Sequence, residues 1–579
     1  MTAEAASETE RPTLIRHGVM WATTAMALLL YLDRFAVGIA SEYIREDLRM
    51  TQAQMGWFLS AFFWSYALAQ VPAGWFADRF GARRMLSIYI LAWSVFTGLM
   101  GVVHAVSLIL LLRLLCGVSQ AGAYPTAGGL LRVWFPISRR GFASSIVALG
   151  GRAGGVLAPI LTAWMIVLFS QGSNPAQFGL PEITNDKNFL ESFQTDQTGG
   201  RKNVIDRLKS QLPESVRSSL ASLKAPLSST TPLIVETSAL IQRPALFDQI
   251  DLTGLKLAPE AIALQEQHAS QHALSDAEAI RLNRLIVEAA MSNSVKKFRG
   301  VGWRPTMILY GVLGIVVALG FYVIARDLPQ RHPWCNAAER SLINDPASLA
   351  ASAAEPDAPF PWLAMLTNVG LWGNSLMQAF TNIGWVFVVT WLPRYLDKVH
   401  AVPLSGQAYM TAIPTAAGIV GMYLGGWWTD KATLYAGRKW GRMLPVMITR
   451  FTAGVGYAIC LVLSLTFTPD PTQTWLPWAY VGALCLMAFS VDMGNPAVWG
   501  YAQDVGGKYT GSALGWANMW GNLGAAAAPP LIYNRILGET PTAGQWTIMF
   551  GVCLLAFVLS GLFALLMDST KPLVRAESR

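Results

Sequence analysis

Apolar stretches of about twenty residues recur along this chain and dominate its hydrophobic pattern. A helix of about 20 apolar residues is long enough to cross the hydrocarbon core of a bilayer, which is about 30 Å thick. The pattern therefore predicts an all-α membrane protein with twelve transmembrane helices. The predicted spans are residues 18–40, 54–76, 85–103, 106–130, 142–169, 303–325, 364–392, 405–428, 443–466, 476–501, 509–533 and 545–567.

The first apolar stretch is predicted to remain in the mature protein as a membrane span. It carries Asp33 and Arg34 in its interior, whereas the apolar core of a cleaved signal peptide is short and follows a basic leader. We therefore count this stretch as the first span.

A charged run is repeated at matching places in the two halves of the pattern. The first copy, GWFADRFGARR at Gly74–Arg84, follows the second span, and a shortened copy, GWWTDK at Gly426–Lys431, follows the eighth. Twelve spans thus divide into six and six, and such internal repeats are typical of secondary transporters. The first copy also resembles the signature between helices 2 and 3 of the major facilitator superfamily, which implies the fold of that family.

We interpret this repeated motif as a conformational latch and not as a binding site, because it lies at the cytoplasmic surface in the predicted topology. Its candidate residues are Gly74, Asp78, Arg79, Gly81, Arg83 and Arg84 in the first copy and Asp430 in the second.

Composition and charge agree with a multi-pass membrane protein. Only 13% of the 579 residues are charged, against about 25% in soluble domains. If the N-terminus is cytoplasmic, the inner loops carry clusters of arginine and lysine and the short outer loops are poorer in basic residues, as the positive-inside rule requires. We therefore expect a protein of the cell (inner) membrane with both termini in the cytoplasm. The net charge of +8 then reflects topology, and we expect no nucleic-acid partner.

A long polar segment, residues 171–302, interrupts the first half between spans 5 and 6, and the topology places it outside the membrane. It has fourteen acidic and fourteen basic residues. Its first thirty residues look irregular, whereas Ser275–Glu278 forms a capping box that starts a helix. We favour a surface insertion over a ligand-capturing domain. His268 and His272 lie four residues apart but lack a third ligand, so we predict no metal site.

The predicted organisation has six segments. They are residues 1–170 with spans 1–5, the insertion 171–302, span 6 at 303–325, a cytoplasmic loop between the halves at 326–362, spans 7–12 at 363–570, and a cytoplasmic tail at 571–579.

Nothing in the chain indicates an enzyme or a bound cofactor. The five cysteines are scattered without a CxxC pair, and no Ser-His-Asp set, P-loop or metal-binding motif is found in the expected context.

Ionisable residues inside the predicted spans are the main functional candidates, because charges inside a bilayer are costly. They are Asp33, Arg34, Arg113, Arg152 and Asp492. Arginines that face one cavity can bind a carboxylate through paired hydrogen bonds. A nearby acid can bind and release a proton. For Arg152 we regard a structural pairing with an acid as the strongest alternative.

Helical spacing places polar side chains on common faces of several spans. The faces are Tyr31 and Arg34; Arg113, Gly117, Gln120 and Tyr124; Asn374, Gln378 and Asn382; Asp492, Asn495 and Trp499; and Asn518 and Asn522. The pairs Gly151/Gly155 and Gly511/Gly515 are expected to allow close approach of neighbouring helices. For any one Asn or Gln, a helix–helix hydrogen bond is the alternative to a binding role.

Several of these segments resemble the anion:cation symporter family, whose members carry sugar acids and other organic anions. The similar segments are Tyr31–Arg34, Ser60–Gly74, Arg113–Pro125, Trp391–Leu396 and Gly511–Asn522. The resemblance implies that Arg34 and Arg113 bind the substrate carboxylate, Tyr31 and Tyr66 its hydroxyls, and Asn518 its far side, while Asp33 takes a coupling proton. Gln120, Asn382 and Trp499 complete the candidate binding set.

One position departs from the pattern of that family. Its proton-coupled sugar-acid members commonly have a glutamate seven residues after the span 4 arginine, where this chain has Gln120. A glutamine cannot carry a proton. We expect Asp492 to be an unpaired acid in mid-span that supplies a second proton site. The alternatives are a structural role for Asp492, fewer protons, or another coupling cation.

The hypothesis we favour is uptake of a small organic anion, such as a hexuronate or an aldonate, by proton symport and alternating access in a monomer. Organophosphate/phosphate antiport is an alternative, but it would be expected to place an arginine in span 7, which has none. A second alternative is a non-transporting sensor whose outer segment binds a ligand.

Overall fold

The computed structural model shows an all-helical chain made of two compact units. The described residues are 11–170, 178–228, 230–244, 246–248, 250–255, 257, 259–269, 274–295, 301–343, 360–400, 402, 404–468, 473–538 and 541–573. One unit comprises Met1–Gly38, Gln52–Pro159 and Met307–Arg579, and the other comprises Ile39–Thr51 and Ile160–Thr306. We call them the bundle and the insertion unit and describe each by itself.

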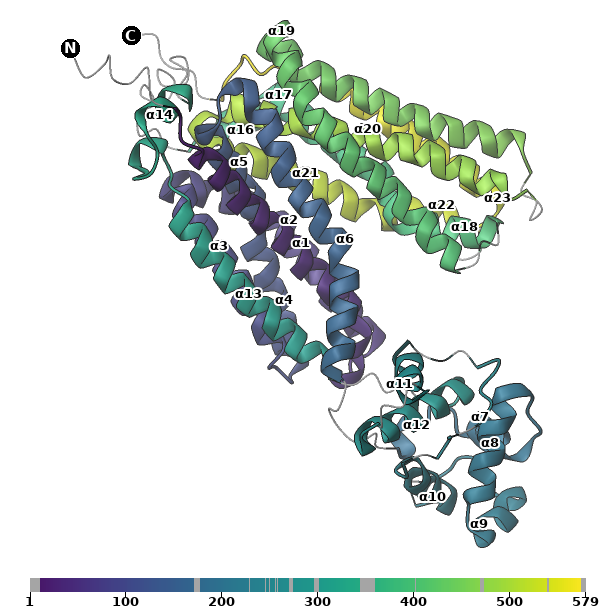
Figure 1. Ribbon diagram of the computed structural model, residues 1–579. Coiled ribbons are helices and arrows are strands. Elements are labelled where there is room, and N and C mark those ends of the chain that lie inside the picture. Colours follow the sequence, from purple (N-terminus) through teal and green to yellow (C-terminus); the bar gives the residue numbers. More distant parts are fainter. Residues whose placement is uncertain are drawn as a thin grey trace, which may run out of the picture. The chain divides into compact units, whose positions relative to one another are not determined.

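The first half of the chain contributes one group of long helices to the bundle (Figure 1). They are α1 (Ile15–Asp47), α2 (Gln52–Phe80), α3 (Ala82–Met100), α4 (Val106–Ala121), α5 (Ala123–Trp134), α6 (Arg140–Ser170) and α13 (Trp303–Ile324), with the short η1 (Ile137–Arg139), η4 (Pro329–Arg331) and α14 (Ala337–Ile343).

The second half contributes the other group. It consists of α16 (Trp362–Thr367), α17 (Val369–Val386), η5 (Phe387–Trp391), α18 (Leu392–His400), α19 (Leu404–Thr466), α20 (Trp475–Gly506), η6 (Gly507–Tyr509), α21 (Thr510–Ala528), η7 (Pro529–Tyr533), α22 (Asn534–Leu537) and α23 (Ala543–Ala564). The elements η5 and η7 are π-helical turns that join α17 to α18 and α21 to α22.

Eight helical segments of the described chain are long and apolar enough to cross a membrane. Two of them, Tyr409–Thr466 and Trp475–Leu537, have 58 and 63 residues, which at about 1.5 Å per residue is enough for two crossings each. Inside α19, Gly437 has a φ of 74°, so the helix is broken there. The helices α2 and α3 lie where two further spans are predicted but are not among the eight. The all-α membrane fold is therefore confirmed, and the number twelve stays a prediction.

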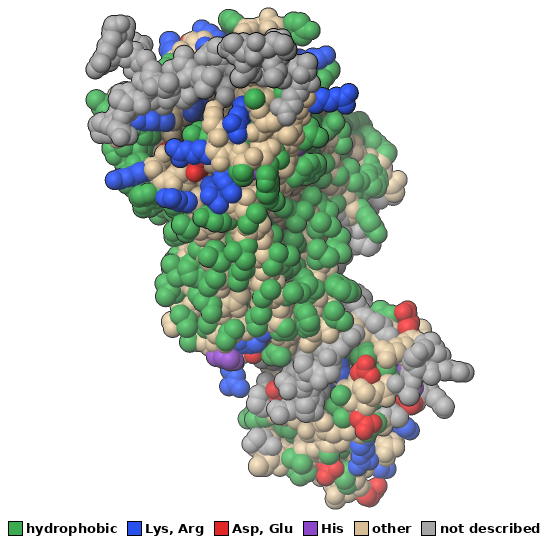
Figure 2. Space-filling view, turned by 60° about the vertical axis from the view of Figure 1, so that its left-hand side comes forward, with side chains coloured by type: hydrophobic (Ala, Val, Ile, Leu, Met, Phe, Trp, Pro, Cys, Tyr) green, Lys and Arg blue, Asp and Glu red, His purple; other side chains and the backbone are tan. Residues whose placement is uncertain are grey.

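The flank of the bundle is apolar, as a surface in contact with lipid must be. Large side chains such as Leu363, Trp57 and Val316 are 75%, 68% and 61% exposed. Figure 2 shows hydrophobic side chains covering the flank, whereas lysines and arginines gather at one end of the bundle. An unpaired backbone group would be costly in hydrocarbon, and helices satisfy all of theirs internally.

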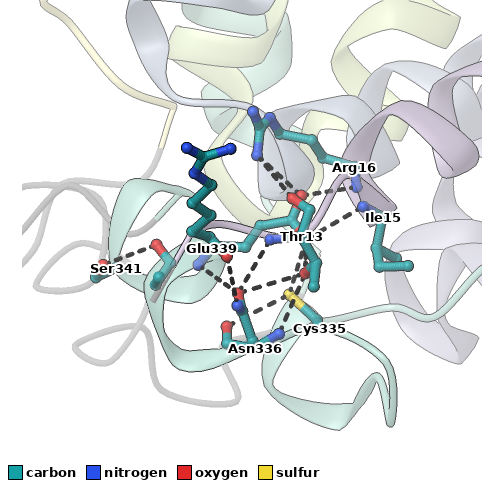
Figure 3. A network of polar contacts seen from close by, with 9 residues as sticks. Thr13, Ile15, Arg16, Cys335, Asn336, Glu339 and Ser341 are labelled. Atoms are coloured by element: carbon teal, nitrogen blue, oxygen red, sulfur yellow. Dashed lines mark hydrogen bonds and ion pairs between the residues drawn. The ribbon is translucent and has the colours of Figure 1, made fainter. Parts of the chain in front are cut away.

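A buried acid fastens the start of the first span to the loop between the halves (Figure 3). Glu339 in α14 accepts hydrogen bonds from the backbone N–H groups of Ile15 and Arg16 at 3.2 and 3.1 Å and from the Thr13 hydroxyl at 2.5 Å. It also pairs with the Arg16 guanidinium at 2.9 Å. Glu339 thus caps the N-terminus of α1, where an acid also interacts favourably with the helix dipole.

The insertion unit has a hydrophobic core of its own. Its helices are η2 (Leu180–Glu182), α7 (Asp186–Gln194), α8 (Gly199–Gln211), α9 (Glu214–Ser219), η3 (Leu220–Ser222), α10 (Pro232–Ile241), α11 (Pro259–Ala269) and α12 (Asp276–Ala290). Side chains such as Phe189, Leu208 and Val287 are fully buried in it. At the edge of the unit, Asp47 pairs with Arg304 at 2.7 Å.

Two predictions about the insertion can be compared with this structure. The capping box at Ser275–Glu278 is present and starts α12. The prediction that the first thirty residues of the insertion are irregular is wrong in part. The helix α7 forms there around the apolar pair Phe189 and Phe193, with Asn185 as its N-cap. His268 lies 3.6 Å from Asp248, and His272 lies outside the described residues.

We predict that the insertion can be removed without unfolding the bundle, because its core is separate and closing a shorter loop costs little entropy. Replacing residues 175–298 by a short Gly/Ser linker should leave a monodisperse protein with an apparent unfolding temperature close to that of the wild type. Thermal unfolding in detergent measures this. Aggregation or loss of helical content in the shortened chain would contradict the prediction.

We predict that Glu339→Gln destabilises the protein by about 1–2 kcal/mol at neutral pH, because it weakens a charged helix cap. Burial acts to raise the pKa of Glu339, but the hydrogen bonds from Thr13, Arg16 and Ile15 outweigh it and lower the pKa below its ordinary value of 4.5. The stabilisation is therefore complete well above pH 4.5 and is lost as the pH falls through the lowered pKa.

The difference in unfolding temperature between the wild type and Glu339→Gln should accordingly shrink in acid. The exposed acid Glu214 provides the control, since its side chain is 82% exposed. An effect of Glu214→Gln equal to that of Glu339→Gln would contradict this role.

Candidate functional site

A cavity of about 200 Å³ lies between the two halves of the bundle. Both helical groups contribute to its wall, and polar and aromatic side chains predominate. Its lining residues are Tyr31, Arg34, Tyr66, Tyr124, Ala148, Arg152, Gln378, Asn382, Met422, Asn495, Val498, Trp499, Asn518 and Asn522. A concave cavity with a few converging polar groups is the usual form of a small-molecule site.

Aromatic rings from the first half hold Arg34 at the cavity wall. Its guanidinium carbon lies 4.4 Å from the centre of the Tyr66 ring and 5.1 Å from the centres of the Tyr31 and Phe62 rings. Its Nη2 donates a hydrogen bond to the Gln120 side-chain oxygen at 3.4 Å. No carboxylate among the described residues forms an ion pair with Arg34. The cation is therefore stabilised by π-faces and remains available to an anion.

Asp33 and Arg113 lie behind this wall and do not line the cavity. The Arg113 guanidinium carbon is 4.4 Å from the centre of the Phe62 ring, so one phenyl ring contacts both Arg113 and Arg34. The Asp33 carboxylate is 1% exposed and lies beside Arg113 and the Trp93 indole. Neither of its oxygens has a hydrogen-bond partner in the described part of the chain.

The prediction of an unpaired Asp492 is wrong. Asp492 on α20 forms an ion pair with Arg152 on α6 at 2.5 Å and accepts a hydrogen bond from Asn495 at 3.0 Å. The structural alternative considered for Arg152 is therefore the arrangement found, and the Trp385 ring packs against the same guanidinium at 4.6 Å. The sequence could not reveal this contact, because the two residues belong to different halves and lie 340 positions apart.

The second half supplies amide and aromatic groups. Asn382 donates to the carbonyl of Gly521 at 2.8 Å, and the Trp499 ring meets Tyr124 edge-on at 5.3 Å across the cavity. Of the eight predicted binding residues, six line the cavity, and Arg113 and Gln120 do not. The cavity residues missing from that set are Tyr124, Ala148, Arg152, Gln378, Met422, Asn495, Val498 and Asn522. Five of them, Tyr124, Arg152, Gln378, Asn495 and Asn522, are polar residues inside the predicted spans, and this position is the sequence signal that points to them.

Glycines allow the helices around the cavity to approach closely. A side chain at Gly511 or Gly515 would collide with the backbone of α2, as predicted for that pair. In α6, however, the glycines against the α1 backbone are Gly150 and Gly154, one position before the predicted pair. Gly151 instead leaves room for the rings of Tyr31 and Tyr124.

The two copies of the charged motif form a reciprocal contact between the halves. Asp78 at the end of α2 accepts hydrogen bonds from the N–H groups of Gly511 and Ser512 at 2.9 and 2.8 Å, at the start of α21. Asp430 in α19 accepts from the N–H groups of Gly141 and Phe142 at 2.8 and 2.9 Å, at the start of α6. Each acid thus caps a helix of the opposite half.

A third link lies at the same end of the bundle. Asp504 on α20 pairs with Arg140 of the first half at 3.1 Å and with Arg442 of the second at 2.9 Å. We call this end, defined by Asp78, Asp430 and Asp504, the latch end. Figure 1 shows the two helical groups meeting here and diverging toward the opposite end.

The remaining motif residues organise the turn between α2 and α3. Gly81 adopts a φ of 91°, which only glycine tolerates easily. Arg83 donates its backbone N–H to Asp327 at 2.8 Å and stacks on Tyr322 at 3.9 Å. Gly74 packs directly against Gly511, Arg79 stacks on Trp75 at 5.3 Å, and Arg84 is exposed.

This architecture, with two helical halves around a polar cavity and a closed end, defines a class of membrane transporters. Residues 23–177 and 298–529 match the sequence model of the Major Facilitator Superfamily, and the chain belongs to that family. The match omits 178–297, most of the insertion.

Similar proteins agree with this assignment. A probable sulfoacetate transporter of Cupriavidus necator is 23% identical over 570 residues, which is 97% of this chain and 95% of that protein. A probable L-galactonate transporter of Escherichia coli K12 is 22% identical and covers 93% and 88%. Among solved structures, a proton:xylose symporter superposes with a TM-score of 0.51 at 12% identity over 95% of this chain and 94% of that one, which supports the fold alone.

We predict that removing both latch acids opens the latch end. In a variant with its natural cysteines replaced, Ser144→Cys reports access, since Ser144 is buried there beside Gln503 of the other half. Asp78→Asn with Asp430→Asn should raise the rate of maleimide labelling several-fold, because the charged helix caps are lost.

The matched control is Asp397→Asn, an acid whose side chain is 46% exposed and whose partners among the described residues, Lys398 and Gln407, belong to its own half. It should leave the labelling rate unchanged. Equal rates in the control and in the double variant would show that the two acids do not hold this end closed.

Proposed function

We propose that this protein is a secondary active transporter that takes up a small organic anion of the sugar-acid type together with protons. The observation that carries the proposal is Arg34, a permanently charged group at a cavity between the halves with no ion-pair partner among the described residues. A carboxylate is the natural ligand of such a guanidinium. Relatives named as transporters of galactonate, of galactarate/D-glucarate and of sulfoacetate support an acidic substrate.

The polar groups around Arg34 suit a hydroxylated acid. Tyr31 and Tyr66 beside the guanidinium, with Asn382 and Asn518 from the second half, can exchange hydrogen bonds with several hydroxyls. Trp499 and Tyr124 offer apolar faces to the carbon skeleton. The substrate would therefore contact both halves at once, as alternating access requires.

Twelve spans with both termini in the cytoplasm fit this role. In that topology the latch end, where the arginine-rich loops lie, faces the cytoplasm, and residues 171–302 lie outside the membrane. With the latch end closed on the cytoplasmic side, the carrier would be in a state whose cavity is reached from the outside. We further propose that the carrier acts as a monomer in the cell (inner) membrane.

Asp33 is the proposed coupling site. It is buried beside Arg113, and neither of its oxygens has a hydrogen-bond partner among the described residues, so both are free to take a proton. Arg113 then acts on Asp33 and not directly on the substrate, which differs from the role implied by the family resemblance. Asp492 remains a candidate for a second proton only when its ion pair with Arg152 opens.

Uptake into proteoliposomes tests the proposal. Labelled D-galactonate or D-glucarate should accumulate when an inward proton gradient is imposed, and Asp33→Asn should abolish this accumulation while substrate exchange without a gradient persists. The reason is that an amide cannot carry the coupling proton. Asp397→Asn serves as the control for a surface acid and should accumulate substrate normally.

Two outcomes would contradict different parts of the proposal, the proton site and the substrate class. Gradient-driven accumulation by Asp33→Asn would remove the assignment of the proton site. Failure of the wild type to bind or carry any sugar acid would remove the proposed substrate class.

A further inference from the structure

Two arginines, and not one, line the cavity. Arg34 reaches it from α1 and Arg152 from α6, and Tyr31 and Tyr124 line the same cavity. Each guanidinium can bind one acid group through paired hydrogen bonds. A small molecule in this cavity is therefore within reach of two separate anion-binding groups.

The two arginines differ in what neutralises them. Arg34 has aromatic rings and an amide oxygen around it, whereas Arg152 is held by the Asp492 carboxylate of the other half. That carboxylate is only partly satisfied. One oxygen receives Arg152 and Asn495, and the other is fully buried without a hydrogen-bond partner in the described structure.

Asp492 would not be left as an isolated charge if Arg152 moved to another partner. The buried Arg450 on α19 interacts electrostatically with it and is anchored on the Val491 carbonyl at 2.8 Å. Asn495 can keep its hydrogen bond as well. Losing the only partner of a buried charge is strongly destabilising, and these two neighbours would reduce that penalty.

From this arrangement we infer that the cavity selects a small dianion, with one acid group on Arg34 and the other on Arg152, which it takes from Asp492. This inference rests on the proposed function and narrows its substrate class to molecules with two acid groups. The formal charge of the groups in and around the cavity is consistent with binding a dianion. Four arginines, Arg34, Arg113, Arg152 and Arg450, stand against two aspartates, Asp33 and Asp492.

A monoacid has less to gain in the same cavity. It can bind Arg34, but its other end must leave the Arg152–Asp492 pair in place and finds only neutral partners. A second charge-assisted contact should therefore favour the diacid on the order of tenfold to a hundredfold.

Equilibrium binding to the purified full-length protein tests this with D-glucarate and D-gluconate, which share a six-carbon hydroxylated chain and differ in one terminal acid group. The wild type should bind D-glucarate at least about tenfold more tightly. Asp492→Asn removes the competing carboxylate and should strengthen D-glucarate binding. Arg152→Gln should bring the ratio of the two affinities close to one.

Arg152→Gln alone leaves Asp492 with one cation fewer and can impair folding. The double variant Arg152→Gln with Asp492→Asn is neutral at both positions and keeps the two side chains able to hydrogen-bond. It should also lose the preference for D-glucarate. The expected change is in the ratio of the two affinities, because a general packing defect would weaken the binding of both ligands equally.

Equal affinities of the wild type for the two ligands would overturn the inference, as would a preference that survives in the double variant. If the wild type binds and carries D-gluconate as well as D-glucarate, the proposed transport of sugar acids stands and only the selection of dianions fails. If neither ligand binds, the proposed function fails with it.

Discussion

A charge inside a lipid-embedded bundle has to be compensated where it lies, because no water is at hand to solvate it. This constraint accounts for the arrangement of the ionisable groups in this chain. Arg152 is compensated by Asp492 and Asp504 by two arginines. Asp33 lies beside Arg113. Arg34 differs from them, since aromatic rings and one amide oxygen surround it, and this difference is the basis of the proposed anion site.

The same constraint explains why the membrane spans and the polar helix faces can be predicted from the sequence. Lipid permits only helices with apolar flanks, so the spans follow from hydropathy, and the few polar residues inside them have to face one another. Spacing places Tyr31 with Arg34, and Asn518 with Asn522, on common helix faces, and all four residues line the cavity. The repeated motif marked the ends of corresponding spans in both halves, and the structure places its two acids in equivalent contacts.

Helical spacing does not show which residue on another helix each polar side chain contacts. Asp492 has no basic neighbour on its own helix, so helical spacing predicts no partner for it, yet Arg152 reaches it from the other half. In α6, glycines lie at 150, 151, 154 and 155, and pairs on adjacent faces have the same spacing, so the face toward α1 was misassigned. The sequence also does not predict that α19 continues through two spans. Gly437, which has a positive φ, joins the two helices without an intervening loop. In the insertion, the polar composition concealed a core built from few but well-spaced apolar residues.

The contact between Asp78 and α21 and the contact between Asp430 and α6 are related as in a two-fold symmetric dimer: each half offers an acid and receives one at a helix N-terminus. Such an interface is isologous, since the same surface patch serves on both sides. A single six-helix unit carrying one acid and one receptive helix start could close this end by pairing with a second copy of itself. One change in that unit would alter both contacts at once. In the single chain the two contacts can differ, and Asp78 accepts a further hydrogen bond from the Ser512 hydroxyl, for which Asp430 has no counterpart among the described residues.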